Sequence, residues 1–272
     1  MAFFTLGCQH TDPRNLELRA DSSMSGGKFM EQIASKGLRA REDAIFEQAN
    51  KMNVPEYLFE LVPVQLTHKI SNKKVEATIW VMPDYFAIGK NSDSVRVPIT
   101  PILAQKIADR FGMMLPTTKM VKQIHQSAEL LLNPHPIKPS GAMTSVEAFI
   151  SHNSAILRQV GSSNIGKLIS GHKKDIVITK RHEKRPSQVA IYGWFRKNNR
   201  PIQPLSLVHN NQYADYSHGV RFIAKTMLVD GVQMKVSDVL KDKFLSKLIS
   251  LEGALSNARI PGAVRENILA IN

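Results

Sequence analysis

The side chains best suited to chemistry gather in one short segment of this sequence, between Gly171 and Arg221. Four of the nine histidines lie there, together with two aspartates and three tyrosines. Imidazole and carboxylate groups are the usual general acids and bases near neutral pH. We therefore predict a set of catalytic residues in which the aspartates orient the histidines: His172, Asp175, His209, Asp215 and His218.

The same histidines could instead bind a metal. His172, His209 and His218 would then be the ligands, and Zn²⁺ is an ion that imidazole and carboxylate groups suit. No HExxH pattern is present, and the chain also lacks the glycine-rich phosphate loops and the GxSxG nucleophile turn. Because Cys8 is the only cysteine, a thiolate cluster and an intrachain disulfide are both excluded. Zinc stays an alternative to metal-free acid/base chemistry.

Short apolar runs are expected to position these residues. His172 comes just before the run DIVIT, and His218 comes just before VRFI. Both runs are rich in β-branched or aromatic residues and so predict strands. Functional side chains commonly lie at strand ends and in the loops beside them. We therefore expect the histidines to project into one shared cleft.

Positive charge and aromatic rings surround the predicted catalytic residues. The chain carries 36 Lys and Arg against 23 Asp and Glu, a net charge of +13. Residues 161–225 hold 12 Lys or Arg and 3 Asp or Glu, so +9 of that charge lies in this stretch. Such a balance favours anionic partners. The predicted substrate-binding residues are Lys173, Lys174, Tyr192, Trp194, Tyr213 and Arg221.

The periodicity of the chain predicts an α+β fold with a mixed or antiparallel sheet and flanking helices. Helices are expected over 29–52, 101–112, 117–132, 144–160 and 236–255, and strands over 68–99, 175–195 and 221–235. We expect a poorly defined segment over 1–20 and a single domain over 21–272. The prolines near 133–143 could divide that domain into two lobes. No apolar run reaches the roughly 18 to 20 residues of a membrane helix, so no membrane span is expected.

A short phrase resembles a known signature. The residues Ser217-His218-Gly219-Val220-Arg221 resemble the SHGCxR motif of L,D-transpeptidases, which cross-link peptidoglycan through a cysteine thiolate. Here valine follows the glycine directly, and the cysteine is missing. The thiolate mechanism therefore cannot operate at this position.

A broader resemblance spans about residues 20–255. The phrases VMPDYFAIG, GHKKDIVIT, AIYGW, PIQPLSLVH and YADYSHGVRFI are similar to a family of uncharacterised bacterial proteins, many of them exported. That family usually has a histidine after YGW, where this chain has Phe195. The resemblance implies an exported or envelope location and extracellular polymers as partners, although the chain shows no readable signal peptide.

Two functions from different classes follow. The first is a hydrolase that acts on a cell-wall or other anionic or glycan polymer through the His/Asp cluster. The second is a basic protein that binds an anionic polymer, either nucleic acid or acidic glycan, without chemistry. The sequence favours the hydrolase because its titratable residues cluster more densely than a binding face requires.

Overall fold

The computed structural model describes residues 24–196 and 198–264, and it has the predicted α+β fold. Within that part of the chain, seven α-helices pack around sheets that are mainly antiparallel, and no sheet closes into a barrel. The expected segment 1–20, which includes Cys8, lies outside the described residues. No described helix is long and apolar enough to cross a membrane.

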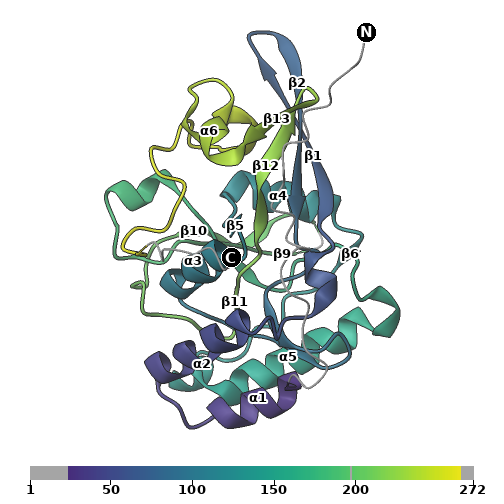
Figure 1. The fold of residues 1–272 in the computed structure, drawn as a ribbon, viewed down its shortest axis with the longest axis vertical. Helices are drawn as coiled ribbons and strands as arrows, with labels where there is room; N and C mark the ends of the chain where they lie inside the picture. Colours follow the sequence, from purple (N-terminus) through teal and green to yellow (C-terminus); the bar gives the residue numbers. More distant parts are fainter. Residues whose placement is uncertain (1–23, 197, 265–272) are drawn as a thin grey trace, which may run out of the picture.

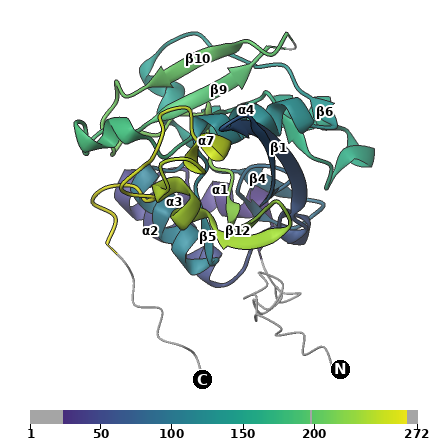
Figure 2. The ribbon, with the colours of Figure 1, turned by 90° about the horizontal axis from the view of Figure 1, so that it is seen from above.

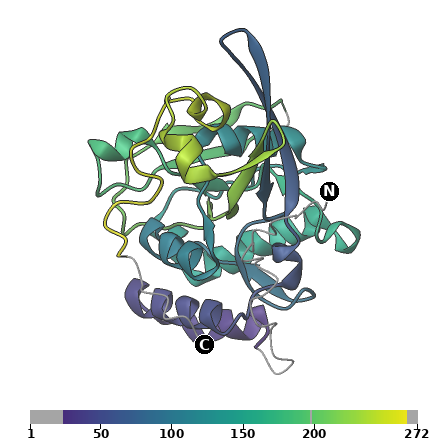
Figure 3. The same ribbon diagram turned by 45° about the horizontal axis from the view of Figure 1, so that its top comes forward.

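The larger sheet is built around a long hairpin. Its strand order is β1-β2-β12-β13, and the short β5 pairs with β12. At the hairpin turn, Ser71 and Asn72 have φ values of 48° and 63°, as the tight turns that join twisted strands require. The hairpin tip extends beyond the rest of the described chain (Figures 1 and 3). The strands are β1 Val62–Ile70, β2 Lys73–Val81, β5 Met113–Met114, β12 Ile223–Val229 and β13 Val232–Lys235.

The second sheet carries the segment with the predicted site. Its order is β10-β9-β8-β11, and only β8 and β11 pair in parallel. Figure 2 shows β9 and β10 on one side of the molecule and β12 on the other. The strands are β8 Lys174–Ile176, β9 Ile191–Phe195, β10 Pro201–Ser206 and β11 His218–Gly219. Two smaller pairs join β3 Ala87–Gly89 to β4 Ser94–Arg96, and β6 Leu130–Leu131 to β7 Ile169–Ser170.

The helices begin and end largely where capping residues predict. Thr100 caps α3, with Pro101 in its first turn, and Gly112 follows its end with φ 64°. The predicted region 29–52 contains the end of α1 and all of α2, which lie opposite the hairpin tip (Figures 1 and 3). The helices are α1 Gly26–Ile33, α2 Leu38–Asn50, α3 Pro101–Arg110, α4 Thr118–Ser127, α5 Val146–Val160, α6 Val236–Lys241 and α7 Ser246–Ile249.

Three helix predictions were wrong in detail. The α4 helix stops at Ser127, because the residues after Ala128 pair with β7 instead of continuing the helix. The α5 helix begins at Val146 with Ser145 as its cap, two residues after the expected start at residue 144. The expected helix over 236–255 is two helices, because the Asp242 side chain accepts hydrogen bonds from the backbone N–H groups of two following residues and replaces helical bonds there.

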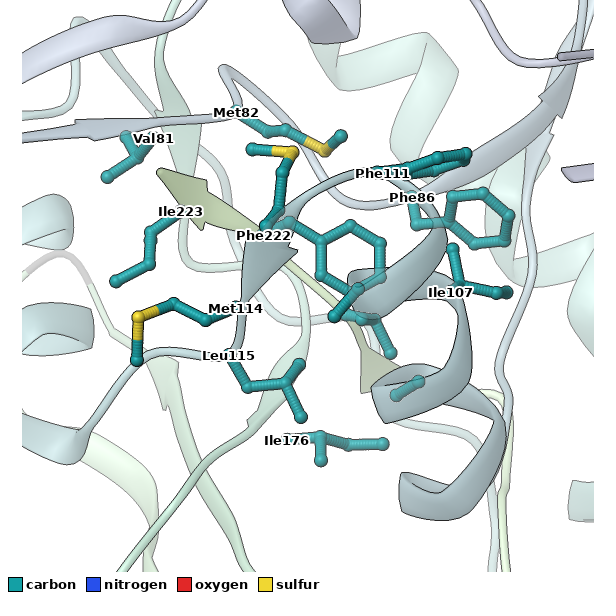
Figure 4. Close-up of a cluster of buried hydrophobic side chains, with 14 of the residues drawn as sticks. Val81, Met82, Phe86, Ile107, Phe111, Met114, Leu115, Ile176, Phe222 and Ile223 are labelled. Carbon is teal, nitrogen blue, oxygen red and sulfur yellow. The ribbon is translucent and has the colours of Figure 1, made fainter. Parts of the chain in front are cut away.

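The core is formed by side chains from both sides of the proline-rich connector. The rings of Phe86, Phe111 and Phe222 lie about 6 Å apart in mutual edge or tilted contacts (Figure 4). One contiguous cluster of buried apolar residues runs from Phe29 to Ile260. This core holds β2 and β12 against the helices and so fixes the loops that lead into β8 and β11.

Candidate functional site

The parallel pair β8–β11 brings the two halves of the predicted site together. His218 lies opposite Lys174, and Gly219 lies opposite Asp175. The pairing is fixed by a hydrogen bond of 2.8 Å from Lys174 N to Ser217 O. Because successive side chains on a strand point to opposite faces, Lys173 and Asp175 lie on one face of this pair, and Lys174 and His218 lie on the other.

We call the first face the inner side. It consists of Asp84, Tyr85, Arg96, His172, Lys173, Asp175 and Arg221, all of them buried. At its centre, the Asp84 carboxylate accepts a hydrogen bond of 2.8 Å from Arg96 Nε and a second bond from Arg96 Nη2. It also accepts one of 2.7 Å from Tyr85 N, and its Oδ1 lies 3.1 Å from His172 Nε2. Burial opposes ionisation of Asp84, but Arg96 and His172 outweigh it and hold the pKa of Asp84 well below its usual range.

Tyr85 connects this carboxylate to a second one. Its hydroxyl donates a hydrogen bond of 2.8 Å to Asp175 Oδ2, and its ring lies 4.5 Å beneath the Arg221 guanidinium. Arg221 in turn donates bonds of 2.6 Å to the carbonyls of Met82 and Ile169. Burial raises the pKa of Asp175 to about 7, although Arg221 opposes the shift. Asp175 therefore titrates near neutral pH.

Lys173 is a fully buried cation of the inner side. Its Nζ donates a hydrogen bond of 2.5 Å to the carbonyl of Tyr216. Burial and the nearby Arg96 lower the pKa of Lys173 to about 7. Gly219 is needed beside it, because a Cβ at that position would lie 2.7 Å from Lys173 Cβ and 2.7 Å from Tyr85 Cδ1.

We call the other face the outer side. It consists of Lys174, His209, Tyr213, Asp215 and His218. Here the site approaches solvent, because His209 is exposed and Lys174 and Tyr213 are half-buried. The Tyr213 ring stacks on His209, with centroids 4.1 Å apart, and meets the edge of His218 at 5.7 Å. The outer side is therefore a short stack of rings that leads from the surface to the buried His218.

Among the predicted catalytic residues, His218 is the buried one whose side chain makes no hydrogen bond. It is 1 % exposed, and neither of its ring nitrogens has a partner. Burial lowers the pKa of His218 to about 4, although Asp215 opposes the shift, so the ring is neutral at pH 7. Buried polar atoms are nearly always hydrogen-bonded, and an exception needs an explanation, such as a catalytic role or a bound water or ion.

Asp215 shapes the turn in front of His218. Its Oδ1 accepts bonds of 2.8 Å and 2.5 Å from the N and Oγ of Ser217, and its Oδ2 accepts one of 3.1 Å from the Tyr213 hydroxyl. Burial would raise the pKa of Asp215, but His218 and Ser217 outweigh it and lower the pKa. Asp215 is therefore ionised beside a neutral imidazole.

Trp194 closes the outer side with a strained backbone. Its φ is 53°, a conformation that bulky residues rarely adopt. The Lys174 ammonium lies 4.9 Å from the centroid of its ring, and its buried Nε1 has no hydrogen-bond partner in the structure. Strain of this kind is found most often at functional sites.

The predicted orientation of the histidines was wrong. His172 is held by Asp84, not by Asp175 or Asp215. The Asp215 carboxylate is engaged by Ser217 and Tyr213 and makes no hydrogen bond to the His218 ring. Of the three predicted histidines, His209 and His218 contact the same tyrosine ring, whereas His172 lies on the inner side.

The predicted binding residues differ in exposure. Lys173, Trp194 and Arg221 are buried and cannot form a surface patch, whereas Lys174, Tyr192 and Tyr213 are half-buried. The described residues also contain no group of three His, Cys, Asp or Glu side chains that could hold a metal ion. The zinc site that the sequence allowed through His172, His209 and His218 is therefore not formed.

Four functional candidates were missed by sequence reasoning: Asp84, Tyr85, Arg96 and His152. Asp84 and Tyr85 lie between two apolar strands, and a charged residue in such a stretch was the available signal. His152, on α5, is fully buried, its ring lies 5.1 Å from Tyr216, and both its nitrogens lack partners. A lone histidine on an amphipathic helix gives no such signal in the sequence.

Comparisons of the chain with protein-family models, with curated proteins and with solved structures find no match. The two resemblances drawn from short phrases therefore stay predictions, and the chemistry of the site rests on its own geometry.

Proposed function

We propose that this protein is a hydrolase that cleaves a cell-wall or other anionic or glycan polymer, with His218 as its acid/base group. The observation that carries the proposal is that the buried His218 ring has no hydrogen-bond partner in the structure. Both of its nitrogens lack partners, and it lies beside Asp215 under a ring stack that reaches solvent. A nitrogen without a protein partner is available to a water molecule or to a leaving group.

The proposed chemistry uses charges of the outer side. A neutral His218 would take a proton from water as the water attacks the scissile bond, and it would return that proton to the leaving group. The ionised Asp215 would stabilise the imidazolium that forms between these steps. The Lys174 ammonium would attract anionic groups of the substrate and of the transition state.

Strong pKa shifts in the same neighbourhood support an enzyme. Burial raises the pKa of Asp175 to about 7 and lowers the pKa of Lys173 to about 7. Groups that are driven toward neutral pH by burial and specific neighbours cluster at active sites. Lys173 and Arg221 are buried, so these two cations of the predicted binding set cannot contact a polymer. The buried groups with shifted pKa values therefore favour a hydrolase over a simple polymer-binding protein.

The proposed substrate class follows from the charge of the whole chain. A net charge of +13 favours an anionic polymer over a neutral one. The resemblance to exported bacterial proteins suggests that this polymer belongs to the cell envelope, and an envelope location is part of the proposal.

The test is release of soluble fragments. The protein is incubated with peptidoglycan, with polygalacturonate as an acidic glycan, with a neutral glucan and with RNA, and products are identified by mass spectrometry. We expect fragments from peptidoglycan or polygalacturonate and none from the glucan or RNA. His218→Gln should release few or none. His182→Gln is the matched control, because His182 is also buried with two unpartnered nitrogens and lies outside the inner and outer sides. Co-sedimentation with a polymer that is never cleaved would favour the binding protein instead.

A further inference from the structure

A cavity lies apart from the proposed active site, between α3, β5, β12 and the segment 258–259. Its volume is about 480 Å³, and none of its lining residues belongs to the inner or the outer side. Small-molecule sites commonly measure about 300–1,000 Å³ and combine apolar walls with a few polar groups. The cavity therefore has the size of a ligand site.

The floor of the cavity is apolar and adaptable. Met113 and Met114 of β5 form part of it, and both are buried apart from the face that they present there. Methionine side chains are flexible and polarizable, so they fit apolar ligands of varied shape. Ala258 adds a small apolar surface on the opposite segment.

One wall is built by a hydrogen-bond network. Arg259 pairs with Asp109 through two bonds of 2.5 Å and 2.6 Å, and Gln105 Nε2 donates one of 3.1 Å to the same carboxylate. Gln105 Oε1 also accepts a bond of 3.0 Å from Ile260 N. This network ties the C-terminal segment to α3, so the cavity has a defined wall. It also leaves Asp109, the one carboxylate of the lining, fully engaged.

The rim of the cavity is cationic. Lys225 and Lys235 line it, and the lining also includes the hydroxyl residues Thr226 and Ser237. Among the residues that the structure describes, the Lys235 ammonium has neither an ion-pair nor a hydrogen-bond partner. Its charge is therefore available to a ligand at the mouth of an apolar cavity.

We infer that this cavity binds a small amphipathic anion, with an apolar body on Met113 and Met114 and a carboxylate at Lys235. The charge of the lining supports an anionic head, because three cations face one carboxylate and that carboxylate is already paired with Arg259. The inference is independent of the proposed hydrolase, because the two sites share no residue.

The test compares an eight-carbon carboxylate with the alcohol of equal length. Isothermal titration calorimetry with octanoate should give saturable binding to one site, and 1-octanol should bind about tenfold more weakly, because a bond to a charged group is lost. Lys235→Met should lower octanoate affinity about tenfold and leave octanol binding unchanged. Lys241→Met, an exposed lysine on α6 outside the cavity, should change neither.

A second variant tests the location. Ala258→Trp should fill the cavity and abolish binding of both ligands, with circular dichroism used to verify that the variant is folded. Absence of saturable octanoate binding to the wild type would overturn the inference. The inference would also be overturned if octanol bound as tightly as octanoate, or if Lys235→Met bound octanoate with the affinity of the wild type. Octanoate binding that survives Ala258→Trp would contradict it as well.

Discussion

The inner and outer sides of the β8–β11 pair are made by alternating residues of the same strands, yet they differ in how their polar atoms are used. On the inner side, Asp84 contacts Arg96, Tyr85 and His172, and the Arg221 guanidinium is bonded to two carbonyls. On the outer side, both nitrogens of His218 are unpartnered although the ring is as deeply buried, whereas each inner-side residue makes at least one side-chain hydrogen bond and only His172 Nδ1 and Arg221 Nε lack a partner there. Burial alone therefore does not distinguish the two sides.

The difference suggests a division of labour. Charges that are buried and paired hold elements together, because separating them leaves an uncompensated charge. Unpartnered polar atoms beside a route to solvent are available to a substrate. We therefore assign the inner side a positioning role and the outer side the chemistry, and the following predictions test that assignment.

The largest expected effect is on stability and concerns the inner side. Asp84→Ala leaves Arg96 buried without its carboxylate, and loss of one partner of a buried pair costs about 3–5 kcal/mol of unfolding free energy. Urea denaturation measures the loss. Lys74→Ala is the control, because Lys74 pairs with Glu76 on the exposed hairpin at 2.5 Å, and such pairs contribute about 1 kcal/mol or less. If Asp84→Ala were as stable as that control, the result would contradict the positioning role assigned to the inner side.

Asp175 should make stability depend on pH. Its pKa is about 7 in the folded protein, against about 3.9 in an unfolded chain. At pH values between these two pKa values, Asp175 is therefore protonated in the folded state and ionised in the unfolded state. The stability of the wild type relative to Asp175→Asn should decline as the pH rises from about 4 to about 7 and then level off. Urea denaturation at a series of pH values measures the difference, and a pH-independent difference would contradict the raised pKa.

Tyr85 should have a smaller effect through one hydrogen bond. Tyr85→Phe removes the 2.8 Å bond to Asp175 and keeps the ring beneath Arg221. We expect a loss of about 0.5–1.5 kcal/mol of unfolding free energy. Because that bond favours the ionised carboxylate, the pKa of Asp175 should also rise. A carbonyl infrared band assigned to the protonated side chain would report the shift, and an unchanged titration would contradict it.

The smallest expected effect is that of a chelator. The described residues bring no three metal-ligating side chains together, so EDTA should leave fragment release unchanged. Loss of activity with EDTA and its recovery with added Zn²⁺ would show that the histidines reach a metal-binding arrangement other than the one described.

Local signals in the sequence predicted most of the elements. The helix expected over 101–112 is α3, and the strands expected over 68–99 include β2 and the end of β1, which begins six residues earlier than expected, at Val62. The break of the last helix could not be predicted, because the Asp242 side chain competes with the helix for backbone N–H groups and its sequence neighbours are ordinary helix formers. Periodicity alone cannot report that competition.

The site was predictable only in part, and the reason is sequence separation. Residues near one another in the chain, such as Tyr213, Asp215 and His218, were identified together and lie together. Asp84 and His172 are 88 positions apart, and their contact depends on how β2 and β8 are brought together by the core. No spacing rule within one segment carries that information.

The most direct test of the central claim compares one histidine from each side in the same assay. Turnover per folded molecule is measured for His218→Gln and His172→Gln, with the folded fraction taken from urea denaturation. We expect His218→Gln to lose about 10²- to 10⁴-fold in the rate of fragment release, with little change in stability. His172→Gln should lose stability and keep its turnover per folded molecule within a few fold. Undiminished turnover in His218→Gln would contradict the account, and so would a loss of turnover per folded molecule that is confined to His172→Gln.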